Sequence, residues 1–421
     1  MIPLIAWRNV WRNPLRSLIV GLAIAIGLFC GIFMQSFQYG IMESRTKDII
    51  QTQTSHVQLH HPKYEKGGET KFILNKGPQI LEALKKESYV KAVSGRILIP
   101  AMLESSNGNF GVELIGVEAE EEANLTLLKD RMVAGDYFKK GKSVGIIVGR
   151  KLAEKIGVKK EGEDGEDAYN FRRRLVFRFQ TASNDISSLR VRVVGVYKTA
   201  NATLEEAQVF IQRKDVDKLL EITGEMHEIA LLTDQRKEFI DEKVAMIQAL
   251  PQLAGNEGVK LESWKDLSPE IELFAQTIKA SSRIIMGVIL LALAFGIINT
   301  MLMAVLERTR ELGMLMSVGM NKAKVFLMIM LETIFLTIVG APIGLLISWG
   351  LVTYYNKNGM DISALTQGAE QFGFSSFVYP EIPTQSYQEI IIMVVITAIL
   401  SAIYPAWKAL KLNPSEAVRA I

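Results

Sequence analysis

Three groups of residues in this 421-residue sequence could do chemistry. Residues 135–143 read Gly-Asp-Tyr-Phe-Lys-Lys-Gly-Lys-Ser and look like a phosphate-binding P-loop. A P-loop has four residues between its two glycines, whereas five separate Gly135 from Gly141, and no clear strand leads into the segment. We therefore interpret residues 135–143 as a turn and expect no nucleotide to bind there.

His56, His60 and His61 form the second group, and imidazole is a common zinc ligand. On a strand, His56 and His60 would share one face of the sheet while His61 pointed to the other. We therefore favour ordinary surface or core histidines over a metal site.

The third group consists of polar residues inside apolar stretches, namely Asn299 and Glu332. A carboxylate within a membrane is costly, so it is a functional candidate by default. Glu332 lies near one end of its apolar stretch, close after Lys322 and Lys324. We favour pairing of Glu332 with these lysines or with another helix, and direct handling of a proton or substrate is the alternative.

Residues 307–321 are the most informative segment and read Glu-Arg-Thr-Arg-Glu-Leu-Gly-Met-Leu-Met-Ser-Val-Gly-Met-Asn. Glu307, Arg308 and Glu311 fall together on one face of a helix. Apolar residues recur at helical spacing on another face, at Leu312, Leu315, Met316 and Met320. The pattern indicates a short amphipathic helix that either rests on the bilayer or docks into the groove of a partner.

Charge is distributed unevenly along the chain. Residues 43–283 hold 37 of the 48 Lys and Arg and 37 of the 45 Asp and Glu, while the other 180 residues hold only 19 charges. This split indicates a neutral, water-soluble domain inserted into a membrane protein, and it excludes a purely soluble enzyme and a disordered chain. A single cysteine excludes an intrachain disulfide, and a neutral block gives no reason to expect a nucleic-acid partner.

Four stretches are apolar enough to cross a membrane, since a spanning helix needs about 20 mostly apolar residues. They are residues 17–42, 284–306, 325–356 and 390–407. Only the third contains a charge, which is Glu332. The first stretch is longer than the apolar core of a signal peptide, about 7–15 residues, so we interpret it as a span.

Lys and Arg residues predict the orientation, because they concentrate on the cytoplasmic side. They lie before the first span, between the second and third, and after the fourth. We therefore predict that both termini, with the tail 408–421, and segment 307–324 are cytoplasmic, and that residues 43–283 and 357–389 are extracytoplasmic. Residues 1–16 place Arg8, Arg12 and Arg16 on one helical face, which predicts an amphipathic helix at the cytoplasmic interface.

Between residues 43 and 283, short apolar runs alternate with helical patterns at differing spacings, which predicts an α+β domain. The expected fold is an α-helical membrane protein with four transmembrane helices and this large domain between the first and second. The helical pattern of residues 269–281 leads toward the second span, and the two could form one continuous rod.

Asn299 and residues 307–319 resemble the signature of FtsX-like, MacB-type (type VII) ABC transporter permeases. The family signature reads Glu-Arg-Thr-Arg-Glu-Ile-Gly, then hydrophobic residues, a small residue and a glycine. Ser317 stands where alanine is usual. The resemblance continues at residues 331–332, in the cluster of Gly340, Pro342 and Gly344, and in residues 404–419, which look like the family's C-terminal tail. Residues 264–270 resemble a stretch that precedes the second span in lipoprotein-releasing LolC and LolE permeases.

The resemblance implies a permease subunit without catalytic residues, bound cofactors or metal ligands of its own. ATP and Mg²⁺ would enter through a partner ABC ATPase subunit, which would dock on the short cytoplasmic segment. The implied ATPase-coupling residues are Glu307, Arg308, Arg310, Glu311, Leu312, Gly313, Leu315 and Gly319. The implied outer domain has a porter lobe, at about 43–110 and 225–283, and an inserted sabre lobe, at about 111–224.

Two permease chains, identical or paralogous, would work by mechanotransmission in the bacterial inner membrane, with a periplasmic carrier or adaptor and membrane lipid as further partners. Three functions fit this scheme. The first is extraction of lipoproteins for transfer to a periplasmic carrier. The second is MacB-like efflux of a drug, peptide or toxin with an outer-membrane partner, and the third is regulation of a cell-wall hydrolase.

Overall fold

The computed structural model describes residues 2–64, 70–138, 144–161, 167–199, 201–217, 219–220, 222, 224–234, 240–363 and 377–411. The chain divides into two compact units. A helical unit comprises residues 1–44, 274–362 and 377–421, and an α+β unit comprises residues 45–273 and 363–376. The P-loop-like residues 139–143 and the tail residues 412–421 lie outside the described residues.

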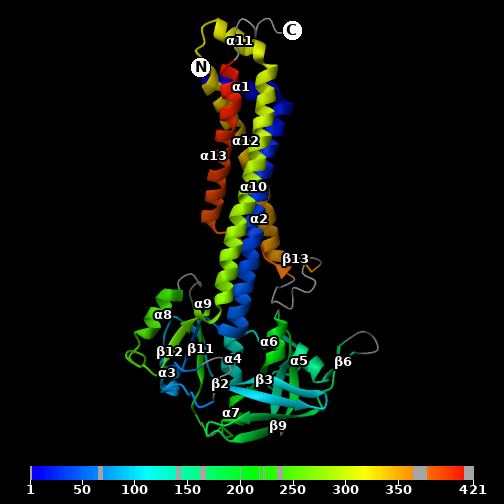
Figure 1. The fold of residues 1–421 in the computed structure, drawn as a ribbon, viewed down its shortest axis with the longest axis vertical. Helices are drawn as coiled ribbons and strands as arrows, with labels where there is room; N and C mark the ends of the chain where they lie inside the picture. The colour runs from blue at the N-terminus through cyan, green and yellow to red at the C-terminus, as the bar shows by residue number, and fades with distance from the viewer. Residues whose placement is uncertain are drawn as a thin grey trace. The chain divides into compact units, whose positions relative to one another are not determined.

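The helical unit is built from long helices that run alongside one another (Figure 1). Its helices are α1 (Ile2–Arg12), α2 (Pro14–Ile49), α10 (Pro269–Glu307), α11 (Thr309–Ser317), α12 (Lys322–Asn358) and α13 (Thr384–Leu410). Within the described ranges, α2, α10, α12 and α13 are the four helices long and apolar enough to cross a membrane. The predicted fold class, four such helices with an α+β domain between the first and second, is confirmed.

Each long helix extends beyond the apolar run that predicted it. The helix α10 continues without a break from Pro269 through the whole second span to Glu307. A short pair of strands, β13 (Met360–Asp361) and β14 (Phe377–Val378), lies between α12 and α13.

Small residues bring α2 and α12 into backbone contact. A Cβ atom added to Gly340 would lie 2.6 Å from the carbonyl oxygen of Gly21, and one added to Gly344 would lie 2.5 Å from that of Ala25. Both distances are shorter than any tolerable contact, so only glycine fits at these two positions. The hydrophobic effect contributes little to the association of helices in lipid, because lipid tails are themselves apolar. Close approach of the two backbones instead strengthens the van der Waals attraction between the helices.

The helix α13 packs on α12, and it buries a second set of small residues. Ala398, Ala402 and Ala406 are spaced four apart, lie on one face and are fully buried. The hydroxyl of Ser348 donates to the carbonyl oxygen of Gly344 at 2.6 Å, which satisfies a polar group that lipid could not. The predicted glycine cluster thus acts as a packing surface.

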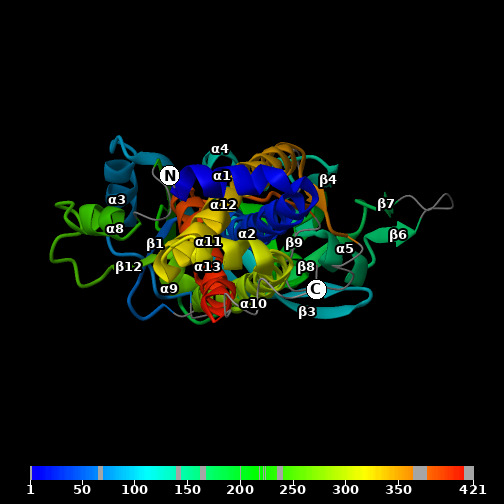
Figure 2. The same ribbon diagram turned by 90° about the horizontal axis from the view of Figure 1, so that it is seen from above.

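The N-terminal helix α1 runs across the end of the long helices (Figure 2). Its buried residues Ala6 and Val10 lie one turn apart, and the helix packs against α12. The ring of Trp7 meets that of Phe335 edge to face, with 5.4 Å between the ring centroids. The helix ends at Arg12, short of the predicted residue 16, and Pro14 begins α2, a position that suits proline.

The α+β unit contains one large mixed sheet of ten strands. In spatial order its strands are β12 (Lys260–Ser263), β1 (Val57–His60), β11 (Glu228–Thr233), β2 (Val90–Ser105), β3 (Gly108–Val117), β10 (Gln208–Gln212), β5 (Gly145–Gly149), β9 (Ile186–Tyr197) and β4 (Met132–Gly135), with β8 (Arg174–Gln180) pairing to β2 and β9. A separate hairpin joins β6 (Lys159–Glu161) and β7 (Asp167–Tyr169). The short helices are η1 (Ile50–Thr54), α3 (Gly77–Leu84), α4 (Ala119–Leu125), α5 (Arg150–Lys155), α6 (Ala202–Ala207), α7 (Arg213–Val216), α8 (Ile240–Gln248) and α9 (Trp264–Leu267).

The long strand β2 belongs to both halves of this sheet. Its residues 90–96 pair with β11, whereas residues 97–105 pair with β3. The predicted limit between the porter and sabre lobes, at residues 110–111, falls inside β3. The division into two lobes stays a prediction.

A buried ion cluster lies where β2 changes partners. Arg96 donates to Glu122 at 2.7 Å and to Glu228 at 2.9 Å, and all three side chains are buried. Burial acts to lower the pKa of Arg96, but the two carboxylates outweigh it, and the net shift is upward. The cluster therefore ties α4 and β11 to one point on β2.

The contact between α2 and α12 is testable by substitution. We expect Gly344→Leu to lower the stability of the detergent-purified protein by about 1–3 kcal/mol or more, because the new side chain overlaps the α2 backbone. The measurement is the midpoint of thermal unfolding. Gly350→Leu is the matched control, since a Cβ at Gly350 of the same helix meets nothing within 4 Å. Equal midpoints for the two variants would contradict the packing described for α12.

Candidate functional site

The segment predicted to couple with an ATPase folds as α11, and it is shorter than the predicted range 307–324. Arg308 interrupts the helical path between α10 and α11, with φ −101° and ψ 17°. Gly319 has a φ of +100°, which favours glycine, and Met320 N–H donates back to the carbonyl oxygen of Leu315 at 3.0 Å. The Asn321 side chain then caps α12. These breaks explain why one predicted segment becomes a short helix and a turn.

One face of α11 is anchored to the long helices, and another is free to meet a partner. Leu312 and Gly313 are buried, and Leu315 packs against the same core. Met314 is exposed, and Val318 is 89% exposed. An apolar side chain presented in this way at the end of a helix suits contact with another protein.

Four charged residues meet beside α11. The Arg308 guanidinium donates through Nε to Glu311 and through Nη1 to Glu332, at 3.0 Å in each case. Arg12 of α1 donates to both carboxylate oxygens of Glu311. Two cations and two anions thus form a charge cluster that joins α1, α11, α12 and the α10–α11 junction.

The inner half of this charge cluster is shielded from solvent. The Arg308 and Glu332 side chains are each 13% exposed. Breaking such a pair leaves an uncompensated charge, which costs far more than breaking a surface pair. The outer pair, Arg12 with Glu311, is more accessible to solvent. The hydrogen bond from Arg12 is the main reason that the pKa of the Glu311 carboxyl lies below its usual value.

The predicted site residues occupy different environments. Glu307 and Arg310 are exposed, as expected of residues that meet a partner. Arg308 instead points inward, and it is Arg308 that binds Glu332. Lys322 and Lys324, the partners considered for Glu332, are both exposed.

Asn299 is exposed on α10 and takes no part in the charge cluster. Arg12 was predicted only as a membrane anchor, and its role as a partner of Glu311 was missed. The spacing of four residues between Arg8 and Arg12 places both on one helical face, and this was the available signal. Nothing in the sequence connects Arg12 to Glu311, which lies 299 positions away.

The histidines have local structural partners in the α+β unit. The Nδ1 atom of His56 accepts from Thr233 N–H at 2.9 Å, and the Nε2 atom of His60 lies 2.5 Å from Glu262 Oε2. The ring of His227 bridges two backbone groups, and burial lowers its pKa. Within the described ranges, no group of three or more His, Cys, Asp or Glu side chains could hold a metal ion.

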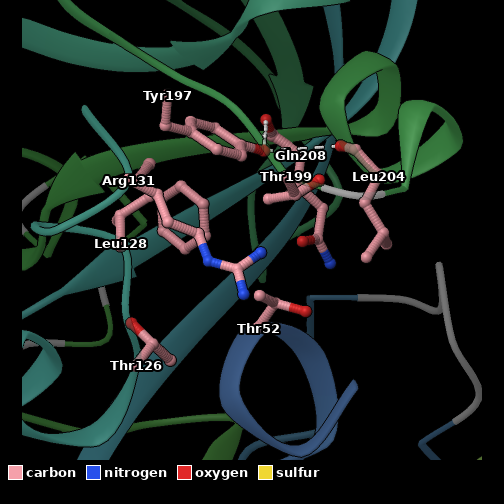
Figure 3. A pocket seen from close by; sticks show the side chains of 9 residues that line it. Thr52, Thr126, Leu128, Arg131, Tyr197, Thr199, Leu204 and Gln208 are labelled. Atoms are coloured by element: carbon pink, nitrogen blue, oxygen red, sulfur yellow. Dashed lines mark hydrogen bonds between the residues drawn. The ribbon is translucent and has the colours of Figure 1, made fainter. Parts of the chain in front are cut away.

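Within the α+β unit, polar contacts hold the last turn of α2 and the residues that follow it. Arg131 pairs with Asp48, and its guanidinium points toward Thr52 beside a cavity of about 10 Å³ (Figure 3). The backbone N–H of Leu127 donates to the carbonyl oxygen of Gln51 at 3.2 Å. A cavity of this size holds at most one water, so the site is an anchor and has no room for a substrate.

The family model for the C-terminal part of FtsX-like permeases matches residues 283–414, which include α11, Arg308 and Glu332. The chain belongs to the FtsX-like permeases of the type VII ABC transporters. This confirms the resemblance found in its sequence. The protein is therefore a multi-pass membrane permease subunit with a large extracytoplasmic domain, and an ABC ATPase is its partner.

Relatives of this permease carry several different names. The ABC transporter permease YtrF of Bacillus subtilis is 25% identical over 376 residues, covering 80% of this chain and 82% of YtrF. The lipoprotein-releasing system transmembrane protein LolC of Buchnera aphidicola is 22% identical over 347 residues, covering 82% of this chain and 79% of LolC. The macrolide export ATP-binding/permease protein MacB of Bordetella avium is 22% identical over 302 residues, covering 70% of this chain and 42% of MacB.

The inner ion pair of the charge cluster gives a quantitative prediction. We expect Arg308→Ala or Glu332→Ala alone to destabilise the detergent-purified permease by about 3 kcal/mol, because each breaks the shielded Arg308–Glu332 pair and leaves one of its charges less well compensated. The double variant should lose less than the sum, by about 1 kcal/mol or more. A parallel cycle with Lys322→Ala and Glu332→Ala is the control and should be additive. Additivity in the Arg308 cycle, with unfolding followed in denaturant, would show that the pair does not stabilise the fold.

Proposed function

We propose that this permease extracts lipoproteins from the bacterial inner membrane and delivers them to a periplasmic carrier. A second permease chain and two ABC ATPase subunits complete the transporter. Both termini and α11 face the cytoplasm, where the ATPase acts, and the α+β unit works in the periplasm. Motion is passed along the helices, and no transmembrane channel is needed.

The arrangement around α11 supports its role as the ATPase docking element. Val318 and Met314 offer apolar contact, while Glu307 and Arg310 offer exposed charges. Leu312 and the charge cluster hold the helix firmly to α12 and α1. A movement of α11 is therefore transmitted directly to α12 and α1.

The observation that carries the lipoprotein assignment is the extent of the likeness to LolC. It runs along 79% of LolC, so nearly the whole of that permease has a counterpart here. The likeness to MacB, which is named as an ATP-binding/permease protein, covers 42% of its length. Apolar side chains such as Leu18 on α2, and Val288 and Leu291 on α10, are exposed. In the membrane they would provide surfaces along which acyl chains can move.

Efflux of a drug, peptide or toxin is the second candidate. It is favoured by the likeness to MacB, a protein named for macrolide export, over 70% of this chain. The two functions differ in where the substrate begins, because a lipoprotein starts in the membrane and an efflux substrate is captured in the periplasm.

Depletion of this permease in its host tests the assignment. We expect triacylated lipoproteins to accumulate in the inner membrane several-fold, measured by quantitative proteomics of separated membranes. Re-expression of the wild-type chain should reverse the accumulation, and a chain lacking residues 309–317 should not. An unchanged lipoprotein distribution together with greater sensitivity to macrolides would favour efflux instead.

A further inference from the structure

The helical unit contains an open cavity of about 560 Å³ between α2, α10 and α13. All of its lining residues belong to these three helices. The helices meet just beside it, since a Cβ on Gly31 of α2 would lie 3.2 Å from Met286 of α10 and 3.4 Å from Ile390 of α13. The volume falls within the range of about 300–1,000 Å³ that is usual for small-molecule sites.

The cavity straddles the boundary between apolar and polar sequence. Arg283 is the last charge before the uncharged run 284–306, and Glu389 is the last before the run 390–407. Both line the cavity at its polar end. Met286, Leu290 and Met393 line its apolar side, within those runs. The cavity therefore spans the depth at which lipid headgroups meet acyl chains on the extracytoplasmic side.

The polar end of the cavity carries more positive than negative charge. Lys279 and Arg283 are four residues apart on α10, so they share one face, and both are exposed. Among the described residues, neither forms an ion pair. The nearby Glu389 accepts a hydrogen bond from Gln385 of its own helix at 3.3 Å. Two adjacent cations on the extracytoplasmic side run against the usual distribution of Lys and Arg, which suggests a specific anionic ligand.

A buried amide faces the same cavity. Gln38 of α2 lines the cavity and is 8% exposed, and its Oε1 atom has no hydrogen-bond partner in the described part of the chain. A buried acceptor without a donor is costly, by about 1–3 kcal/mol. A ligand with a hydroxyl group at headgroup depth would supply the missing donor.

We propose that this cavity binds an anionic, hydroxyl-bearing phospholipid of the outer leaflet, such as phosphatidylglycerol. The phosphate lies against Lys279 and Arg283, a headgroup hydroxyl donates to Gln38, and an acyl chain covers Met286 and Leu290. The proposal goes beyond the proposed function, because this lipid is a resident of the permease and is bound without ATP, ATPase or transport.

Native mass spectrometry of the full-length, delipidated permease tests the headgroup. We expect phosphatidylglycerol to bind about tenfold more tightly than phosphatidylcholine, as two cations near a membrane surface can provide. Lys279→Gln combined with Arg283→Gln should abolish this preference. Lys357→Gln, which removes an exposed cation at the end of α12 outside the cavity, should preserve it. Equal binding of the two lipids by the wild-type chain would overturn the proposal.

A second pair of variants tests the cavity itself. Gly287 lines the cavity, and a Cβ there meets nothing within 4 Å, so Gly287→Leu fills the space without a clash. We expect it to reduce phosphatidylglycerol binding at least several-fold. Gly296→Leu on the same helix also points into open space, but away from the cavity, and should leave binding unchanged. Normal binding by Gly287→Leu, or displacement of phosphatidylglycerol by an equimolar triacylated peptide, would contradict a resident lipid.

Discussion

An ionised carboxylate near the end of a membrane span must have a cation, and this requirement organises the cytoplasmic end of the permease. Glu332 of α12 obtains its cation from Arg308, at the junction where α10 turns into α11. Arg308 also holds Glu311, and Glu311 holds Arg12. The position of α11 is therefore set by the need to neutralise a buried charge, and α1 is part of the same arrangement.

Backbone contact provides the stiffness that such an arrangement needs. Gly340 and Gly344 bring α12 against Gly21 and Ala25 of α2, and α13 packs on α12 with its alanines buried. Because the backbones touch at these glycines, little space is available there to absorb a movement of α12. In the α+β unit, the ion pair of Arg131 with Asp48 holds the last turn of α2 in place.

Local patterns in the sequence predicted the spans, the α+β domain and the short helix after the second span, because hydropathy and helical spacing are properties of neighbouring residues. The partners of the charges were not predictable in this way. Arg308, one of the predicted coupling residues, faces inward and binds Glu332, and Arg12 lies 299 residues from Glu311. The cavity of Gln38, Arg283 and Glu389 was likewise hidden, because its walls come from three helices that are distant in sequence. Family resemblance pointed to residues 307–319, while tertiary packing decides which of them face outward.

The central claim is that the charge cluster transmits ATPase movement from α11 to the spanning helices. Exchange of charges across the outer pair tests it most directly, with ATP hydrolysis and lipoprotein release measured together on the reconstituted transporter. The account predicts that the Glu311→Arg transporter still hydrolyses ATP but no longer releases lipoprotein, since the new positive charge on α11 then repels both Arg12 and Arg308. Adding Arg12→Glu should restore a large part of release. Normal release by the Glu311→Arg transporter would contradict the account.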